Sequence, residues 1–112
     1  MGIIVQKFGG TSVADAQACA LVVSRIAEAR RAGNDVVAVV SAMGRKPAPY
    51  STDALLALVD CAGDTLPPRE RDAIAACGEI ISSVVLVSAL VASGCPAMSF
   101  TGAQAGIETD DN

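Results

Sequence analysis

Apolar and polar positions in the first part of the chain predict a strand, a helix and a second strand. Residues 3–6 (IIVQ) form an apolar run typical of a short buried strand. Residues 13–31 have helical spacing, with an apolar stripe at i, i+3, i+4 and i+7 made of Cys19, Val22, Val23 and Ile26. Residues 36–43 (VVAVVSAM) are rich in β-branched side chains, which is typical of a central parallel strand covered on both faces.

Capping and turn residues predict where the helices begin and end. Ser12 and Asp15 have the spacing of a capping box at the start of the first helix, and residues 33–35 (GND) end it. After a loop rich in turn formers, Ser51 or Thr52 can cap a second helix that starts at Asp53.

The rest of the chain predicts a long helical stretch and a third strand. Residues 67–72 (PPRERD) open a helix with proline at its start, and Gly78 bends or breaks it. Residues 79–94 are apolar nearly all round, so we expect a buried helix. Residues 96–102 (PAMSFTG) then read as a strand centred on Ala97–Phe100. The order β-α-β-α-α-β predicts an α/β fold with parallel strands.

The sequence KFGGTSV, residues 7–13, separates the first strand from the first helix. Paired glycines let a ligand approach the backbone, and a helix N-terminus presents unpaired N–H groups with a partial positive charge. Lys7 adds a full charge, so the segment suits an anion. From these residues alone, a tight β–α turn with a solvated lysine remains an equal alternative.

Glu79 is the only charged residue between Asp72 and Glu108. A buried carboxylate without a partner is costly, and no lysine or arginine is near it in the sequence. Two interpretations stay open: an exposed acid in the first turn of a helix, favoured by the helix dipole, or a carboxylate that meets a cationic group from elsewhere.

Composition narrows the class of protein. The 112 residues suffice for one small domain, and 52% of them are hydrophobic, so we expect a globular chain. A net charge of −4 and 3% aromatics argue against nucleic-acid binding. The 4 cysteines are widely spaced and histidine is absent, which disfavours a zinc site and favours reduced thiols in the cytoplasm. No signal peptide is visible, and the longest apolar stretch is interrupted by serines, so we expect no membrane association.

Six segments, in this order, resemble the N-terminal part of aspartate kinases in the amino acid kinase family, and together they extend over essentially the whole chain. They are IIVQKFGGTSVAD, GNDVVAVVSAMG, STDALLAL, PPRERD, CGEIISS and SFTGAQAGI. The loop GRKPAPYSTD resembles the longer form found in the Bacillus type. The resemblance implies a three-layer αβα fold with a mainly parallel sheet, of the carbamate kinase-like type, of which this chain is an incomplete part.

The resemblance also implies a reaction and its residues. Aspartate kinases transfer the γ-phosphoryl group of ATP, used with Mg²⁺, to the side-chain carboxylate of L-aspartate, the first step toward lysine (through diaminopimelate), threonine and methionine. Lys7 would be catalytic, Thr52 and Glu79 would bind aspartate, and no residue of this segment would bind metal. The positions implied for the ATP phosphates are Lys7, Phe8, Gly9, Gly10, Thr11, Ser12 and Ser41.

The chain departs from the family's pattern in its extent. Residues 1–112 would be the N-terminal portion of the kinase domain, without its downstream half or the regulatory ACT domains, and inactive alone. We expect the complete enzyme to be a cytoplasmic oligomer. Alternatives are a glutamate, acetylglutamate or uridylate kinase, or a non-catalytic module that binds a partner chain or phosphate. A P-loop ATPase is disfavoured because no GxxxxGK[ST] motif occurs.

Overall fold

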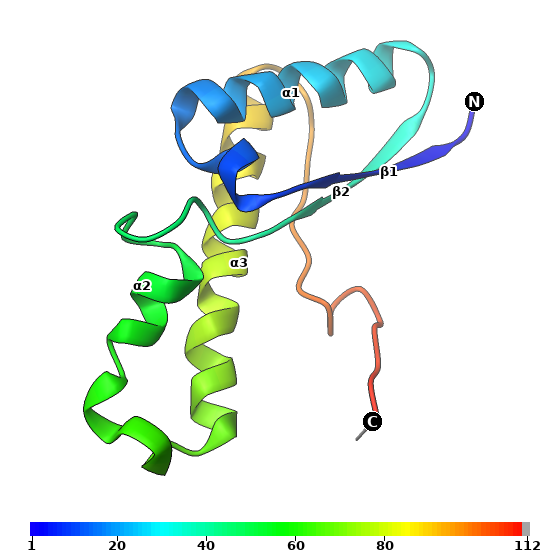
Figure 1. Cartoon of the computed structure of the whole chain (residues 1–112). Helices are drawn as coiled ribbons and strands as arrows, with labels where there is room; N and C mark the ends of the chain where they lie inside the picture. The colour runs from blue at the N-terminus through cyan, green and yellow to red at the C-terminus, as the bar shows by residue number, and fades with distance from the viewer. Residues whose placement is uncertain (111–112) are drawn as a thin grey trace.

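The computed structural model describes residues 1–110, in which two parallel strands joined by a helix are followed by short helical segments, one long helix and an extended tail (Figure 1). The elements, in chain order, are β1 (Ile3–Phe8), η1 (Gly10–Val13), α1 (Ala16–Arg31), β2 (Asp35–Val40), α2 (Thr52–Ala57), η2 (Asp60–Thr65) and α3 (Pro68–Ala92). The prediction of strand, helix and strand at the start of the chain is confirmed. β1 is longer than expected and contains Lys7 and Phe8.

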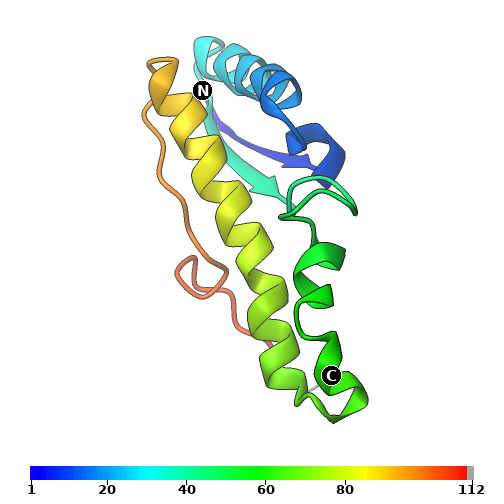
Figure 2. The ribbon, with the colours of Figure 1, turned by 90° about the vertical axis from the view of Figure 1, so that its left-hand side faces the viewer.

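β1 and β2 pair in parallel from Ile3 opposite Asp35 to Phe8 opposite Val40, with α1 as the crossover between them. The core forms where α1 meets the sheet and the last turns of α3 (Figure 2). Its buried members are Val13, Cys19, Val22, Ile26, Leu86 and Leu90, and Phe8, Val36 and Val40 pack against them. The apolar stripe read from the sequence therefore faces the core as expected.

The other side of the sheet is open within residues 1–110. Ile3 and Val5 of β1 are 73% and 65% exposed, and Val37 and Val39 of β2 are also exposed. The expectation that the second strand is covered on both faces is wrong for this part of the chain, because its helices pack against one face alone. Two of the three layers of an αβα arrangement are thus present.

The predicted third strand is not formed. Residues 95–100 are extended, and their exposure alternates as in a strand, but they pair with no other strand in the part of the chain that the structure describes. A cavity of about 910 Å³ is lined on one side by Val36–Val40 and on the other by this segment, including Met98 and Phe100. An extended segment becomes a strand only when its N–H and C=O groups bond to a neighbouring strand, and here they form no hydrogen bond with β2.

α3 differs from expectation in two ways. It runs for 25 residues through Gly78 without a break, so the predicted bend is wrong. It is also less buried than predicted, since only Gly78, Ser82, Leu86 and Leu90 are buried while Ile80, Val84, Val85 and Val91 are exposed. The reason is that α1 and α2 contact it along one side. By length and by a mean hydropathy of 2.2, α3 meets the criteria for a membrane-crossing helix, which core helices of soluble proteins also meet.

The residues that cap the helices agree with the sequence prediction for α2 and α3 but differ for α1. Asp15, not Ser12, caps α1, because its carboxylate accepts the Ala18 N–H at 2.8 Å after a separate turn of 3₁₀ helix. Ser51 is the cap of α2, accepting the Ala54 N–H at 3.2 Å and donating to the Ala48 carbonyl at 2.8 Å. Pro68 opens α3 as predicted.

Candidate functional site

The glycine-rich turn after β1 offers several free backbone donors. Ser12 N–H donates to the Gly9 carbonyl at 3.0 Å, which closes the turn. The N–H groups of Gly9, Gly10 and Thr11 form no hydrogen bond within residues 1–110. Three adjacent unpaired donors at the end of a strand give a local positive potential that can receive an anion.

The two glycines of this turn have different surroundings. A Cβ on Gly10 would lie 2.7 Å from the Ala42 carbonyl oxygen and 3.2 Å from that of Gly44, so no side chain fits there. A Cβ on Gly9 would meet nothing within 4 Å, and its φ of −74° is open to any residue. Packing explains Gly10, whereas the open space over Gly9 suits the close approach of a ligand to the backbone.

The turns that follow β1 and β2 are joined to each other. Ser41 N–H donates to the Phe8 carbonyl at 3.3 Å, and Gly44 N–H donates to the Gly10 carbonyl at 2.9 Å. Because the strands are parallel, both turns lie at the carboxyl edge of the sheet, where open α/β sheets bind their ligands. Ser41, half-buried, is therefore placed beside the glycine-rich turn.

Gly78 brings α3 against the same place. A Cβ on Gly78 would lie 2.8 Å from the Ala42 Cβ, 3.1 Å from the Leu55 Cδ1 and 3.4 Å from the Tyr50 carbonyl oxygen. Ala42, 5% exposed, thus touches Gly10 through its carbonyl and Gly78 through its methyl group. We call Gly10, Ala42 and Gly78 the Ala42 junction. It links the glycine-rich turn, the end of β2 and the helix that carries Glu79.

The residues that the sequence singled out lie on the elements that the junction links. Gly9 to Ser12 and Ser41 lie at the joined turns, Thr52 is the first residue of α2, and Glu79 follows Gly78 directly. Glu79 sits in the middle of α3 and is exposed, so the interpretation of a first-turn acid is wrong. It forms no ion pair with a described residue and lines the cavity beside β2.

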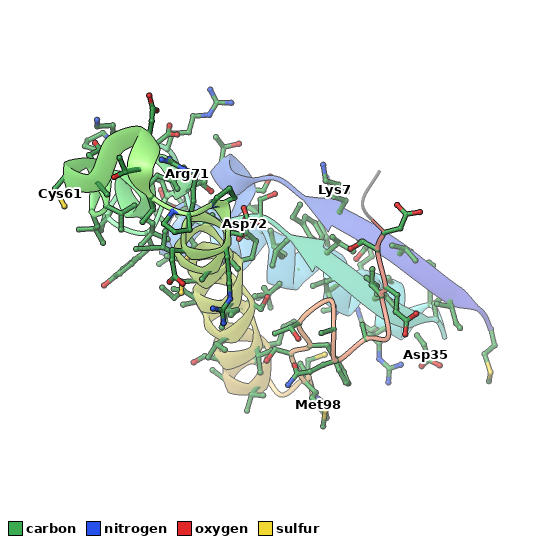
Figure 3. The ribbon with its side chains drawn as sticks, turned by 90° about the horizontal axis from the view of Figure 1, so that it is seen from below. Lys7, Asp35, Cys61, Arg71, Asp72 and Met98 are labelled. Carbon is green, nitrogen blue, oxygen red and sulfur yellow. The ribbon has the colours of Figure 1, made fainter. Side chains whose placement is uncertain are left out.

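Lys7 and Phe8 point to opposite sides of β1. The Lys7 side chain is exposed and projects from the strand into open space (Figure 3). The Phe8 ring packs against the core, so only its backbone belongs to the turn. Among the described residues, no three His, Cys, Asp or Glu side chains come together to hold a metal ion. Burial raises the pKa of the Cys19 thiol, which lies in the core away from the junction and stays protonated.

Sequence reasoning missed the structural part of this site. The sequence pattern predicts a bend or break at Gly78 and gives no prediction for Ala42. A glycine inside a long apolar helix is a signal of close packing, and a small residue just after a buried strand is a natural partner for it.

Comparison with known proteins identifies similar sequences and a similar fold. The pattern of the amino acid kinase family matches residues 2–112. The chain is 53% identical to aspartokinase 1 of Bacillus subtilis over 111 residues, which are 99% of this chain and 28% of that protein. It is 48% identical to the aspartokinase of Mycolicibacterium smegmatis over 109 residues, 97% of this chain and 25% of that one. The chain therefore spans about a quarter of the length of these relatives.

A crystal structure of aspartate kinase from Synechocystis superposes with a TM-score of 0.80 and 41% sequence identity, covering 93% of this chain and 17% of that one. This likeness confirms the predicted fold class, a partial αβα fold with a parallel sheet. The resemblance to aspartate kinases, including the Bacillus type, is confirmed as well.

Proposed function

Because the chain belongs to the amino acid kinase family, we propose that the protein containing it is an aspartate kinase. It would transfer the γ-phosphoryl group of ATP to the side-chain carboxylate of L-aspartate. The observation that carries this proposal is the Ala42 junction, which holds a turn with three free N–H groups against the helix that bears an isolated carboxylate. The relatives named aspartokinase support the choice of acceptor.

The turn after β1 is the proposed phosphate site. The free N–H groups of Gly9, Gly10 and Thr11 provide fixed dipoles for phosphate oxygens, and the hydroxyls of Ser12 and Ser41 lie beside them. Lys7 adds a mobile positive charge at the end of β1 that can follow the phosphoryl group as it moves. Phosphoryl transfer depends mainly on positioning and charge neutralisation, which these groups supply.

The acceptor site is proposed at Thr52 and Glu79. The isolated carboxylate of Glu79 would bind the α-ammonium group of aspartate, and Thr52 would contribute a hydroxyl. The side-chain carboxylate of aspartate is itself the nucleophile, so the reaction needs no protein base. The absence of histidine from the 112 residues is compatible with this chemistry.

The metal would come with the nucleotide. Mg²⁺ would accompany ATP and neutralise part of the charge on its phosphate oxygens. The turn after β1 fits this arrangement, since the free N–H groups of Gly9, Gly10 and Thr11 are donors for phosphate oxygens.

We also propose what the complete enzyme that contains this chain would be. Residues 1–112 would form the N-terminal portion of a kinase domain in a cytoplasmic oligomeric enzyme. The enzyme would act at the start of lysine, threonine and methionine synthesis, with no nucleic-acid or membrane partner.

The test is to express the protein and trap its product with hydroxylamine, since an acyl phosphate gives a coloured hydroxamate. Aspartate with Mg²⁺ and ATP should give hydroxamate, whereas glutamate, N-acetylglutamate and uridylate should give neither hydroxamate nor ADP release. Turnover with one of these in place of aspartate would identify another amino acid kinase. Nucleotide binding with no turnover on any of them would indicate a binding module.

A further inference from the structure

Two cationic side chains follow the turn after β2 and have no role in the site described above. Arg45 and Lys46 come directly after Gly44, and both are exposed. Neither forms an ion pair with another residue of the described part of the chain, where the ion pairs are Arg30 with Asp35 and Arg69 with Glu70. Their charges are available to a ligand.

The loop that carries them is held in place at both ends. At its start, Gly44 N–H donates to the Gly10 carbonyl at 2.9 Å, and Gly44 has a φ of +73° that a larger residue would rarely adopt. Within the loop, Ala48 N–H donates to the Arg45 carbonyl at 2.8 Å. At its end, the buried Ser51 bonds to the Ala48 carbonyl through both its N–H and its hydroxyl. The backbone under the two cations is therefore anchored to the glycine-rich turn.

The loop lies at the carboxyl edge of the strands, next to η1 (Figures 1 and 2). In a chain with a net charge of −4, this edge carries Lys7 on β1 and Arg45 and Lys46 on the loop. A turn with three unpaired N–H groups, next to a loop that carries two exposed cations, suits a polyanion better than a single carboxylate.

We propose that Arg45 and Lys46 bind the phosphates of the nucleotide and set the affinity for it. This inference rests on the proposed function. Exposed cations on a loop contact a charged ligand equally well before and during the reaction, so they lower KM for ATP without raising kcat. Lys7 differs, because its strand places it at the turn itself, where charge moves during transfer.

The experiment compares variants of the complete protein. The double variant Arg45→Ala with Lys46→Ala should raise the Kd for ATP and KM for ATP by about 3–10-fold, from the range of measured exposed charge pairs. Its kcat and its KM for aspartate should be unchanged. Charge-conserving exchange, Arg45→Lys with Lys46→Arg, should keep most of the affinity. Arg69→Ala is the matched control, since its side chain is 92% exposed at the far end of α3 and should change nothing.

Binding is measured by calorimetry with ATP and with inorganic tripolyphosphate, at low and at high salt. Weaker binding of both probes, with the difference between variants shrinking at high salt, supports a phosphate contact. An unchanged Kd for both probes, or a change in KM for aspartate instead, would overturn the proposal. Melting temperatures confirm that the surface variants are folded.

A parallel Lys7→Ala measurement separates this inference from the function on which it rests. If Lys7→Ala impairs turnover and the loop variants bind ATP normally, the role of the loop is refuted and the kinase assignment stands. If the wild-type protein itself binds neither ATP nor tripolyphosphate, the proposed function fails.

Discussion

Replacing Gly78 by alanine tests whether the Ala42 junction positions the site. The new Cβ would lie 2.8 Å from the Ala42 Cβ, whereas carbon atoms in contact normally lie about 3.5–4.0 Å apart. α3 and the turn after β2 must therefore separate by about 1 Å, or the Leu55 side chain and the Ala42 backbone must both shift.

Two opposing effects set the stability of this variant. Alanine in the middle of a helix is favoured over glycine by about 0.8–1.0 kcal/mol. Overpacking a close contact costs about 1–3 kcal/mol. The difference predicts a free energy of unfolding that is between about 0 and 2 kcal/mol lower than in the wild type. The effect on turnover should be larger, because a displacement of about 1 Å between catalytic groups can cost about 10²-fold in rate.

A second substitution makes the test specific. Ala42→Gly removes the nearest atom that the new methyl group would meet, and the flexible end of the Leu55 side chain at 3.1 Å can move, so Gly78→Ala combined with Ala42→Gly should recover activity. Unfolding in urea gives the coupling energy of this double-mutant cycle, which should be about 1–2 kcal/mol for two residues in contact. Hydroxamate formation by the complete protein gives the matching values of kcat and KM.

The reasoning is refuted if Gly78→Ala is more stable than the wild type by about the full helix preference of alanine and retains its activity. Failure of Ala42→Gly to rescue a damaged Gly78→Ala protein would refute it as well. Either result would mean that α3 is not held to the turn through this contact.

Further predictions concern the two charged site residues, the behaviour of residues 1–112 expressed alone, and the reactivity of the cysteines. Lys7→Ala should lower kcat by about 10²–10³-fold with little change in KM for aspartate, measured by steady-state kinetics; a normal kcat would make Lys7 a solvated strand residue. Glu79→Gln should raise KM for aspartate by about 10–150-fold but leave KM for ATP unchanged, and equal changes in both would contradict an ammonium site. Residues 1–112 expressed alone should show no turnover and should self-associate in size-exclusion chromatography, because Ile3, Val5 and the edge of β2 are exposed; an active monomer would disprove this. Cys61 and Cys77 should react with a thiol reagent before Cys19, whose pKa is raised by burial, and early labelling of Cys19 would contradict its burial. Because the Cys19 thiol ionises at lower pH in the unfolded chain than in the folded one, the free energy of unfolding should fall as the pH rises above 9.0, the ordinary pKa of the thiol.

The sequence by itself determined the local elements of this protein. The stripe of Cys19, Val22 and Ile26 predicted α1 and the face that it buries, and Pro68 predicted the start of α3. The composition of residues 7–13 predicted a turn able to receive an anion. These features depend on spacing, caps and backbone freedom within a few residues, so the sequence contains all the information that they need.

Only the tertiary structure decided how the local elements act together. Gly9 and Gly10 are equivalent in the sequence. In the structure, the Ala42 carbonyl leaves no room for a side chain at Gly10, whereas the space beside Gly9 is open. Glu79 lies in mid-helix, since α3 continues through Gly78, and the close contact of Gly78 with Ala42 is what leaves no room for a side chain there. Residues 97–100 have the exposure pattern of a strand but pair with no other strand in the part of the chain that the structure describes. Each outcome depends on atoms far away in the chain, because close packing and strand pairing are properties of two surfaces and not of one segment.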